Sequence, residues 1–266
     1  MPDMRPLKPG VLMLRRWFSS FFDPVSIFRS FAAFPGYVAA WRRYARVPGA
    51  EQIRLLDAYP CLHDRTRHSG IDSHYFYANG WTMRRIIAQG SPYHVDVGSQ
   101  TIFANLLAAT VPVVFVDYRP LQASLSGLTC IGSDILALPF RDASIHSLSC
   151  LHVAEHIGLG RYGDNLNPSG TRLACAELAR VLAPGGNLYF ALPVGHPRVY
   201  FNAHRVHTPD TILEYFAKLH LEEFSGVHDD GHFVERAELT EFLDSDYACG
   251  FFWFRRPLRD EVMNNE

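Results

Sequence analysis

The stretch from His152 to His156, HVAEH, holds two histidines and a glutamate that could act on a substrate. Its spacing fits the pattern H-x-x-E-H, in which two histidines on one helix bind zinc and the glutamate acts as a base. In a second interpretation the same residues form a loop after a strand, where one histidine takes a proton from a substrate. The two interpretations imply different chemistry, and the neighbouring sequence distinguishes them.

The residues around HVAEH favour a loop. IHSLSCL, directly before His152, has the pattern of a strand, and GLGRYG begins within two residues of His156, so no long helix is available for two zinc ligands. We therefore expect no metal site, and a metal-dependent hydrolase remains only an alternative. His152, at the strand end, is a candidate general base, since a histidine has a pKa of about 6.5; a buried, satisfied histidine is the other interpretation. Glu155 and His156 are expected to cap and orient the loop.

Acidic residues and a glycine mark the ends of two further strand-like runs. Asp96, Gly98 and Ser99 lie at the end of YHVDVGS, and Asp117 lies near the end of VPVVFVDY. In a doubly wound sheet, ligands bind where the carboxyl end of a strand meets the start of a helix. Asp117 follows Asp96 by about 20 residues, an interval at which an acidic side chain can hydrogen-bond ribose hydroxyls. The pattern indicates a nucleoside site at this edge.

A third strand-like run ends at Asp134 and Ile135. Asp134 could accept a hydrogen bond from an adenine amino group while Ile135 packs against the ring, or Asp134 could cap a turn. Gln100 and Ile102 stand where a dinucleotide site has glycines. Because a pyrophosphate needs the close backbone approach that those glycines permit, the stretch disfavours a nicotinamide dinucleotide.

Two polar loops are expected to supply the groups that bind a substrate. Both follow strand-like runs, so we expect them to converge on the same carboxyl edge of the sheet. Their candidate residues are Arg161, Tyr162, Asp164, Asn202, His204 and Arg205. Such side chains suit a polyhydroxylated or anionic substrate, and His204 is a second candidate base.

The elements that must position these residues alternate along the chain. Short apolar runs are separated by helical stretches, an order that predicts a parallel sheet with crossover helices. The predicted strands are YHVDVG, VPVVFVDY, LTCIGSD, IHSLSCLH, GNLYFALPV, LHLEEFSGVH and CGFFWFRRP. Helices are predicted over 101–110, 170–182 and 208–219, and residues 51–92 are interpreted as a connecting region. We predict a Rossmann-like, doubly wound α/β fold with a seven-stranded, mostly parallel sheet, in a domain over residues 51–266.

Residues 1–50 are predicted to be a separate helical arm. The arm is rich in arginine and aromatic residues, and Pro35-Gly36 and Pro48-Gly49 are expected to divide it into two helices. No apolar run of about 20 residues could cross a membrane. Its basic, aromatic character is typical of a segment that packs on a partner, mediates self-association or touches a lipid surface. Nucleic acid is not an expected partner.

The composition is that of a folded, reduced protein. The chain has 266 residues and 48% hydrophobic content, enough for one large α/β domain with an appendage. Its five cysteines are widely spaced and form no C-x-x-C pair, which indicates free thiols and a cytoplasmic location, with membrane association through the arm as an option.

Four segments together resemble the class I S-adenosylmethionine-dependent methyltransferase superfamily, over residues 90–256. They are HVDVGSQ, VVFVDY, IGSDILALPFRDASIHSLSCLHVAEHI and ELARVLAPGGNLYFALP. HYFYANGW, VDYRPL, EHIGLGRYGD, FNAHR and CGFFWFRRP further resemble a branch known as domain of unknown function 268. The resemblance implies S-adenosylmethionine as the cofactor, held by Asp96, Gly98, Ser99, Asp117, Asp134 and Ile135.

The expected function is therefore methyl transfer to an oxygen by direct SN2 displacement. The polar loops suggest a sugar or surface-glycan precursor as the acceptor, and hence a role in polysaccharide biosynthesis. The alternative is a methyltransferase-like module that has lost the cofactor and binds a partner. The metal-dependent hydrolase is the further alternative.

Overall fold

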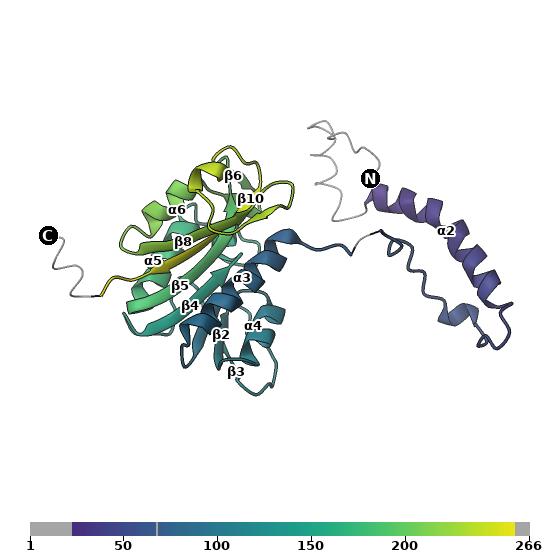
Figure 1. Ribbon diagram of the computed structural model, residues 1–266, viewed down its shortest axis with the longest axis horizontal. Helices are drawn as coiled ribbons and strands as arrows, with labels where there is room; N and C mark the ends of the chain where they lie inside the picture. The colour runs from purple at the N-terminus through teal and green to yellow at the C-terminus, as the bar shows by residue number, and fades with distance from the viewer. Residues whose placement is uncertain (1–22, 68, 259–266) are drawn as a thin grey trace. The chain divides into compact units, whose positions relative to one another are not determined.

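The computed structural model describes residues 23–67 and 69–258. The chain divides into two compact units, of which the first ends at Gly70 and the second begins at Ile71 (Figure 1). Unit 1 therefore takes in the predicted arm and the segment that follows it, and its described elements are helix α2 (Pro24–Tyr44) and the 3-10 helix η1 (Leu55–Asp57). Unit 2 contains the sheet.

Helix α2 corrects one prediction about the arm. It begins after Asp23, whose side chain accepts a hydrogen bond from the Val25 N–H at 3.0 Å, and it continues without a break through Pro35. The predicted division at Pro35-Gly36 is wrong. A proline inside a helix costs about 3 kcal/mol because its missing N–H leaves one carbonyl without a partner, but alanines on both sides favour helix strongly enough to continue it. In the part of the chain that the structure describes, no helix is both long and apolar enough to cross a membrane.

Unit 2 is a doubly wound α/β fold. Its sheet has the strand order β3-β2-β1-β4-β5-β10-β8-β9, in which the first five strands are parallel and β10 runs antiparallel to both of its neighbours. The sheet strands are β1 (His94–Val97), β2 (Val113–Asp117), β3 (Leu128–Gly132), β4 (Ile145–Leu151), β5 (Leu182–Val194), β8 (His220–Val227), β9 (Phe233–Val234) and β10 (Ala248–Arg255). The other elements are α3 (Ser73–Gln89), α4 (Thr101–Ala108), η2 (Ala154–His156), α5 (Gly170–Val181), β6 (Arg198–Tyr200), β7 (His204–Val206), α6 (Pro209–Tyr215) and η3 (Leu239–Phe242).

The described sheet has eight strands, where the sequence predicted seven. The seven predicted runs all form strands, so the fold class is confirmed. The additional strand is β9, two residues long, which pairs antiparallel with the end of β8 at the edge of the sheet. A strand of two residues has no alternation that a sequence could reveal.

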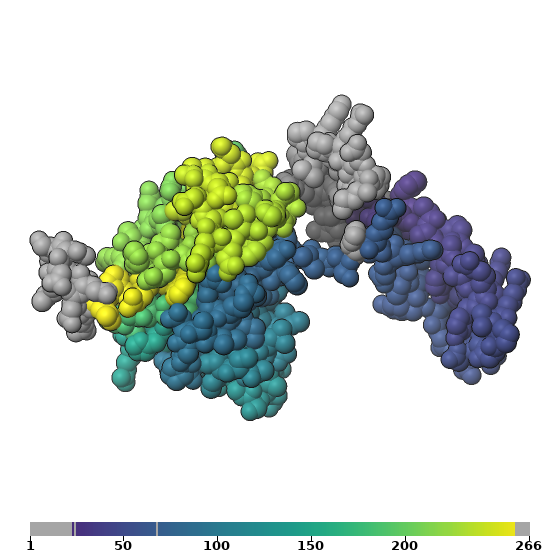
Figure 2. Space-filling view, viewed as in Figure 1, coloured from purple at the N-terminus to yellow at the C-terminus, as the bar shows by residue number. Residues whose placement is uncertain are grey.

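Helix α3 was missed because residues 51–92 were interpreted as a connection. The Asp72 side chain caps its start, and Gly90 ends it with a φ of +64°. Its Trp81 is fully buried and donates to Ser225 at 3.0 Å, while Arg85 forms an ion pair with Glu223. These contacts attach α3 to the C-terminal strands, and the blue helix lies directly against the yellow-green segments in the space-filling view (Figure 2).

The core lies on both faces of the sheet. Strand β5 shows the arrangement, because successive side chains of a strand point to opposite faces. Leu188 and Phe190 alternate with Tyr189 and Ala191 between the two buried clusters. One cluster includes α5 and α6, and the other includes α3 and α4. The carboxyl ends of the parallel strands are thereby held rigidly at one edge, where the candidate site lies.

Candidate functional site

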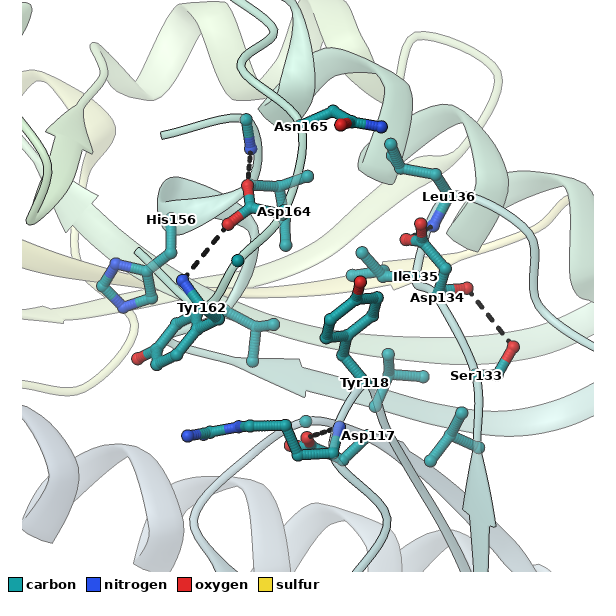
Figure 3. Close-up of a pocket in the computed structure, with 18 of the residues that line it drawn as sticks. Asp117, Tyr118, Ser133, Asp134, Ile135, Leu136, His156, Tyr162, Asp164 and Asn165 are labelled. Atoms are coloured by element: carbon teal, nitrogen blue, oxygen red, sulfur yellow. Dashed lines mark hydrogen bonds between the residues drawn. The ribbon is translucent and has the colours of Figure 1, made fainter. Parts of the chain in front are cut away.

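A cavity of about 320 Å³ opens at the carboxyl ends of β1, β2 and β3 (Figure 3). It is within the usual size of a small-molecule site. Seven sequence-predicted residues line it. They are Gly98, Asp117, Asp134, Ile135, His152 and, from the first polar loop, Tyr162 and Asp164. In Figure 3 Asp134 and Leu136 lie across the cavity from Tyr162 and Asp164, with Tyr118 between them.

Asp96 and Ser99 lie beneath this cavity and are not among the described residues that line it. Asp96 is fully buried, and its carboxylate accepts from the Ser99 hydroxyl at 2.6 Å and from the Ser149 hydroxyl at 2.5 Å. Ser99 in turn accepts from the Leu151 N–H at 3.0 Å. Burial raises the pKa of Asp96 to about 6, although the serine contacts oppose that shift. Asp96 and Ser99 thereby connect β1 to β4 and hold the backbone on both sides of Gly98.

Gly98 needs to be glycine. Its φ of +68° lies in the left-handed region, and a Cβ there would approach the side chain of Val153 to 3.1 Å and point toward the Asp117 carboxylate at 3.8 Å. A side chain at this position would also take space from the cavity. Both the backbone conformation and the limited space therefore favour glycine at this position.

Asp117 and Asp134 each use one carboxylate oxygen to stabilise the local turn. Asp117 Oδ1 accepts from the Arg119 N–H at 2.7 Å, and Asp134 Oδ1 accepts from the Leu136 N–H at 2.9 Å. The turn-capping role considered for Asp134 is therefore present. Both residues line the cavity, and no hydrogen bond to either second oxygen is found within the described part of the chain. The neighbouring Ile135 and Leu136 supply apolar surface.

The first polar loop closes one side of the cavity. Asp164 accepts from the Gly158 N–H at 2.6 Å and from the Tyr162 N–H at 3.3 Å, so it holds the loop in shape. Although burial opposes the change, these backbone donors hold the pKa of Asp164 below its usual range. Two guanidinium groups lie over the Tyr162 ring, that of Arg119 at 4.6 Å and that of Arg161 at 5.2 Å from the ring centroid.

A second, more open cavity of about 530 Å³ adjoins the first. Histidines dominate its lining, so we call it the histidine hollow. The side chains that define it are those of His74, Tyr75, His152, Glu155, His156, Arg161, His204 and Tyr247. His152 and His156 line both cavities and mark the boundary between them.

His152 is held tightly at this boundary. It directly follows β4 with a φ of +58°, and only 8% of the residue is exposed. Its Nδ1 lies 3.3 Å from Glu155 Oε1, and its Nε2 lies 3.3 Å from Cys249 Sγ. Burial opposes protonation, yet contacts with Cys249 and Glu155 raise the pKa of His152 overall. Both ring nitrogens are engaged, which disfavours His152 as a simple base.

The H-x-x-E-H interpretation does not fit the described geometry. His156 ends a 3-10 helix of three residues, so it and His152 are not on one face of an α-helix. Its Nδ1 lies 2.5 Å from the Ala203 carbonyl, and its Nε2 lies 3.8 Å from Glu155 Oε1. Burial would raise the pKa of Glu155, but the two histidines lower it overall. His156 connects this turn to the β6–β7 hairpin, as its predicted structural role requires.

The second polar loop contributes one of its three candidates to the histidine hollow. His204 lines the hollow, with its ring 4.9 Å from that of Tyr247. Asn202 is exposed in the turn between β6 and β7 and lines neither cavity. Arg205 is buried and donates to the carbonyls of Ile157 at 2.6 Å and Asn167 at 3.0 Å. Arg205 therefore supports the first polar loop from behind, in contrast to its predicted contact with substrate.

Several site residues were not predicted. Tyr118 follows Asp117 at the cavity rim, and its position next to a predicted ribose ligand was a usable signal. His74, Tyr75, Tyr247 and Cys249 come from α3 and from the region of β10. Nothing local in the sequence connects these residues with HVAEH.

Comparison with known proteins identifies the class of fold. A Haloferax volcanii protein described as a methyltransferase, solved with the Trm112 methyltransferase activator, matches with a TM-score of 0.51 and 15% identity, over 69% of this chain and 90% of that chain. A Galdieria sulphuraria protein described as a sarcosine dimethylglycine methyltransferase matches with a TM-score of 0.50 and 13% identity, over 68% and 86%. At such identities the similarity establishes a methyltransferase-type Rossmann-like fold in unit 2.

A sequence family matches as well. Residues 143–231 match the model of the family described as "Caenorhabditis protein of unknown function, DUF268". The matched segment contains HVAEH, both polar loops and the β6–β7 hairpin, so the DUF268 resemblance inferred from those motifs is confirmed there. No curated protein sequence matches the chain.

Proposed function

We propose that the protein is an S-adenosylmethionine-dependent methyltransferase. The observation that carries the proposal is the cavity at the carboxyl edge, where Gly98, Asp117 and Asp134 meet on a methyltransferase-type fold. Asp117 would receive the ribose hydroxyls, and Asp134 with Ile135 would receive the adenine. Asp96 and Ser99 would act by holding Gly98 in position and would not touch the cofactor.

The histidine hollow is the proposed acceptor site. It shares His152 and His156 with the cavity proposed for the cofactor, so an acceptor bound there would lie next to the methyl donor, as direct transfer requires. Its polar lining suits an alcohol, and we propose a sugar or surface-glycan precursor as the acceptor, in polysaccharide biosynthesis. Arg161 at its margin would favour an acceptor that also carries an anionic group.

The acceptor hydroxyl must lose its proton as the methyl group arrives. We propose His204 as the base and His152 as the residue that positions the acceptor, because both His152 nitrogens are already engaged. The expected result for His204→Ala is a turnover about 10²–10⁴-fold lower with unchanged cofactor affinity. His146→Ala, on the exposed side of β4, is the matched control.

Calorimetric titration of the full chain with S-adenosylmethionine, followed by methyl-transfer assays on nucleotide-sugar and oligosaccharide acceptors, tests the proposal. Saturable binding and methylated product are expected. Absence of affinity for the cofactor would overturn it in favour of the partner-binding module.

Unit 1 is proposed to act through its exposed aromatic residues. On α2, Phe28 is 74% exposed and Phe31 is 77% exposed, and the basic residues Arg42 and Arg43 lie in its last turn. This composition supports contact with an anionic lipid surface by a protein that is otherwise cytoplasmic. Sedimentation with anionic vesicles, lost on Phe28→Ser with Phe31→Ser, is the expected result; self-association without vesicle binding would contradict it.

A further inference from the structure

A second cluster of chemically competent groups lies at the wall of the histidine hollow. His74 at the start of α3, His152 after β4 and Cys249 on β10 each offer one ligand atom, and these three atoms lie within 4.8 Å of one another. The residues come from three separate parts of the sequence. From this proximity we propose that His74, His152 and Cys249 bind a zinc-class divalent cation at the wall of the hollow.

The distances suit tetrahedral coordination. Zinc binds imidazole nitrogen at about 2.0–2.1 Å and thiolate sulfur at about 2.3 Å, so two such ligands of a tetrahedral ion lie roughly 3.6 Å apart. His152 Nε2 and Cys249 Sγ are 3.3 Å apart. The His74 ring stacks nearly parallel to the His152 ring, with centroids 5.9 Å apart, and is only half-buried. A small rotation of His74 completes three ligands.

Glu155 supplies the outer support that metal-binding histidines require. Such a histidine donates its other N–H to a carboxylate, which fixes the ring orientation. His152 Nδ1 lies 3.3 Å from Glu155 Oε1, so Nε2 is left to face Cys249. Glu155 is 1% exposed, and its Oε2 has no hydrogen-bond partner among the described residues although Glu155 lines the hollow. A buried carboxylate oxygen left open beside the cluster indicates that a ligand or its bound water completes this site.

The same residues could be interpreted as a nucleophile, base and orienting acid in the order Cys249, His152, Glu155. That interpretation requires a substrate to reach the sulfur. Cys249 is fully buried and is absent from the described lining of both cavities. The nucleophile interpretation gives His74 no role, whereas the metal site uses it as the third ligand.

Three protein ligands leave one position of the cation open. The hollow extends from His74 and His152 toward His204, so that position faces the proposed acceptor site. In a step that rests on the proposed methyl transfer, a cation held there would bind the acceptor oxygen and lower the pKa of its hydroxyl. The O–H bond would break with its proton passing to His204, while the O–CH₃ bond forms and the S–CH₃ bond of the methyl donor breaks to leave a neutral thioether.

Metal content of the full-length protein tests the site. The purified protein is stripped with a chelator, reloaded with Zn²⁺ or Co²⁺ and desalted, and about one equivalent per chain is expected to remain. His74→Ala and Cys249→Ser should each abolish retention. The cobalt form should show a thiolate-to-cobalt charge-transfer absorption that Cys249→Ser removes. Glu155→Gln should retain the spectrum but weaken affinity roughly 10–100-fold, as loss of an outer-shell carboxylate does.

Matched variants separate this site from non-specific binding. Cys175→Ser removes another buried thiol, on α5, and His146→Ala removes an exposed histidine, and both should retain the metal. Retention of one equivalent by both His74→Ala and Cys249→Ser, or no retention by the parent, would overturn the site. If Cys249→Ser does not fold, His74→Ala decides, because His74 is only half-buried at the helix start.

Cofactor titration on the same samples distinguishes the two proposals. Metal binding without affinity for S-adenosylmethionine would refute the methyltransferase function and support the metal site. Cofactor affinity without retained metal would support the methyltransferase function and refute the metal site.

Discussion

Asp117 offers the most direct test of the cofactor site. It lies at the carboxyl end of β2, half-buried, with Oδ1 occupied by the Arg119 N–H and the whole residue lining the cavity. One oxygen is therefore available for the ribose. A hydrogen bond to a charged acceptor contributes about 1.5–3 kcal/mol, so Asp117→Ala should weaken S-adenosylmethionine binding about 10- to 150-fold.

Two further variants make the measurement specific. Asp117→Asn keeps an oxygen for the Arg119 N–H but removes the charge, and neutral hydrogen bonds have roughly half the strength, so a smaller loss is expected. Asp244→Ala removes an exposed carboxylate that lines neither cavity and should leave the affinity unchanged.

Isothermal titration calorimetry measures all three affinities, and thermal melting checks that each variant is folded. Arg119 is exposed, so water can replace the lost acceptor and the melting temperature should change little. A parent that binds the cofactor and an Asp117→Ala variant that binds it equally well would refute the assignment of the ribose site.

Three other predictions concern neighbouring residues. Gly98→Ala places a Cβ 3.1 Å from Val153 at a φ of +68°, so calorimetry should show at least tenfold weaker cofactor binding; parental affinity would contradict this. His156→Ala should lower the melting temperature, because His156 contacts the Ala203 carbonyl; an unchanged melting temperature would argue against a structural role. Burial lowers the pKa of His94 to about 3, so the unfolded chain takes up its proton first and stability falls as pH drops below about 6.5. In urea titrations the parent should lose about 2 kcal/mol more between pH 7 and pH 5 than His94→Gln does, and parallel losses would exclude His94 as the cause.

The fold was predictable where the sequence signal is local. The strand-like runs and the helices between them alternate clearly, and Pro184-Gly185-Gly186 separates α5 from the body of β5, so a doubly wound sheet followed. Helix α3 escaped notice although Asp72 and Gly90 are ordinary start and stop signals. Strand β9 could not be found, since its pairing depends on β8 and not on its own two residues.

The site was predictable only in part, for a related reason. Asp117 ends β2, while Gly98 and Asp134 lie one and two residues after β1 and β3, and the topology alone brings such positions together. Arg205 is an example of a residue whose role could not be predicted. Its polar side chain suggested contact with a substrate, but no sequence pattern shows that its guanidinium donates to two buried backbone carbonyls. His74 and Cys249 are near opposite ends of unit 2 in sequence and meet His152 only through long-range packing.

Two buried polar networks lie at β4. They differ in whether every polar group has a hydrogen-bond partner. Around Asp96, the hydroxyl of Ser149 donates to the carboxylate and accepts from His94, and Ser99 fills the remaining positions, so the network is satisfied internally. Around Glu155, one oxygen orients His152 and the other has no partner in the described structure. A buried oxygen without a hydrogen-bond partner destabilises the folded chain by about 1–3 kcal/mol. A ligand that binds this oxygen would offset that cost. The first network therefore supports the backbone beside Gly98, which lines the first cavity, and the second leaves one oxygen of Glu155 open beside the histidine hollow.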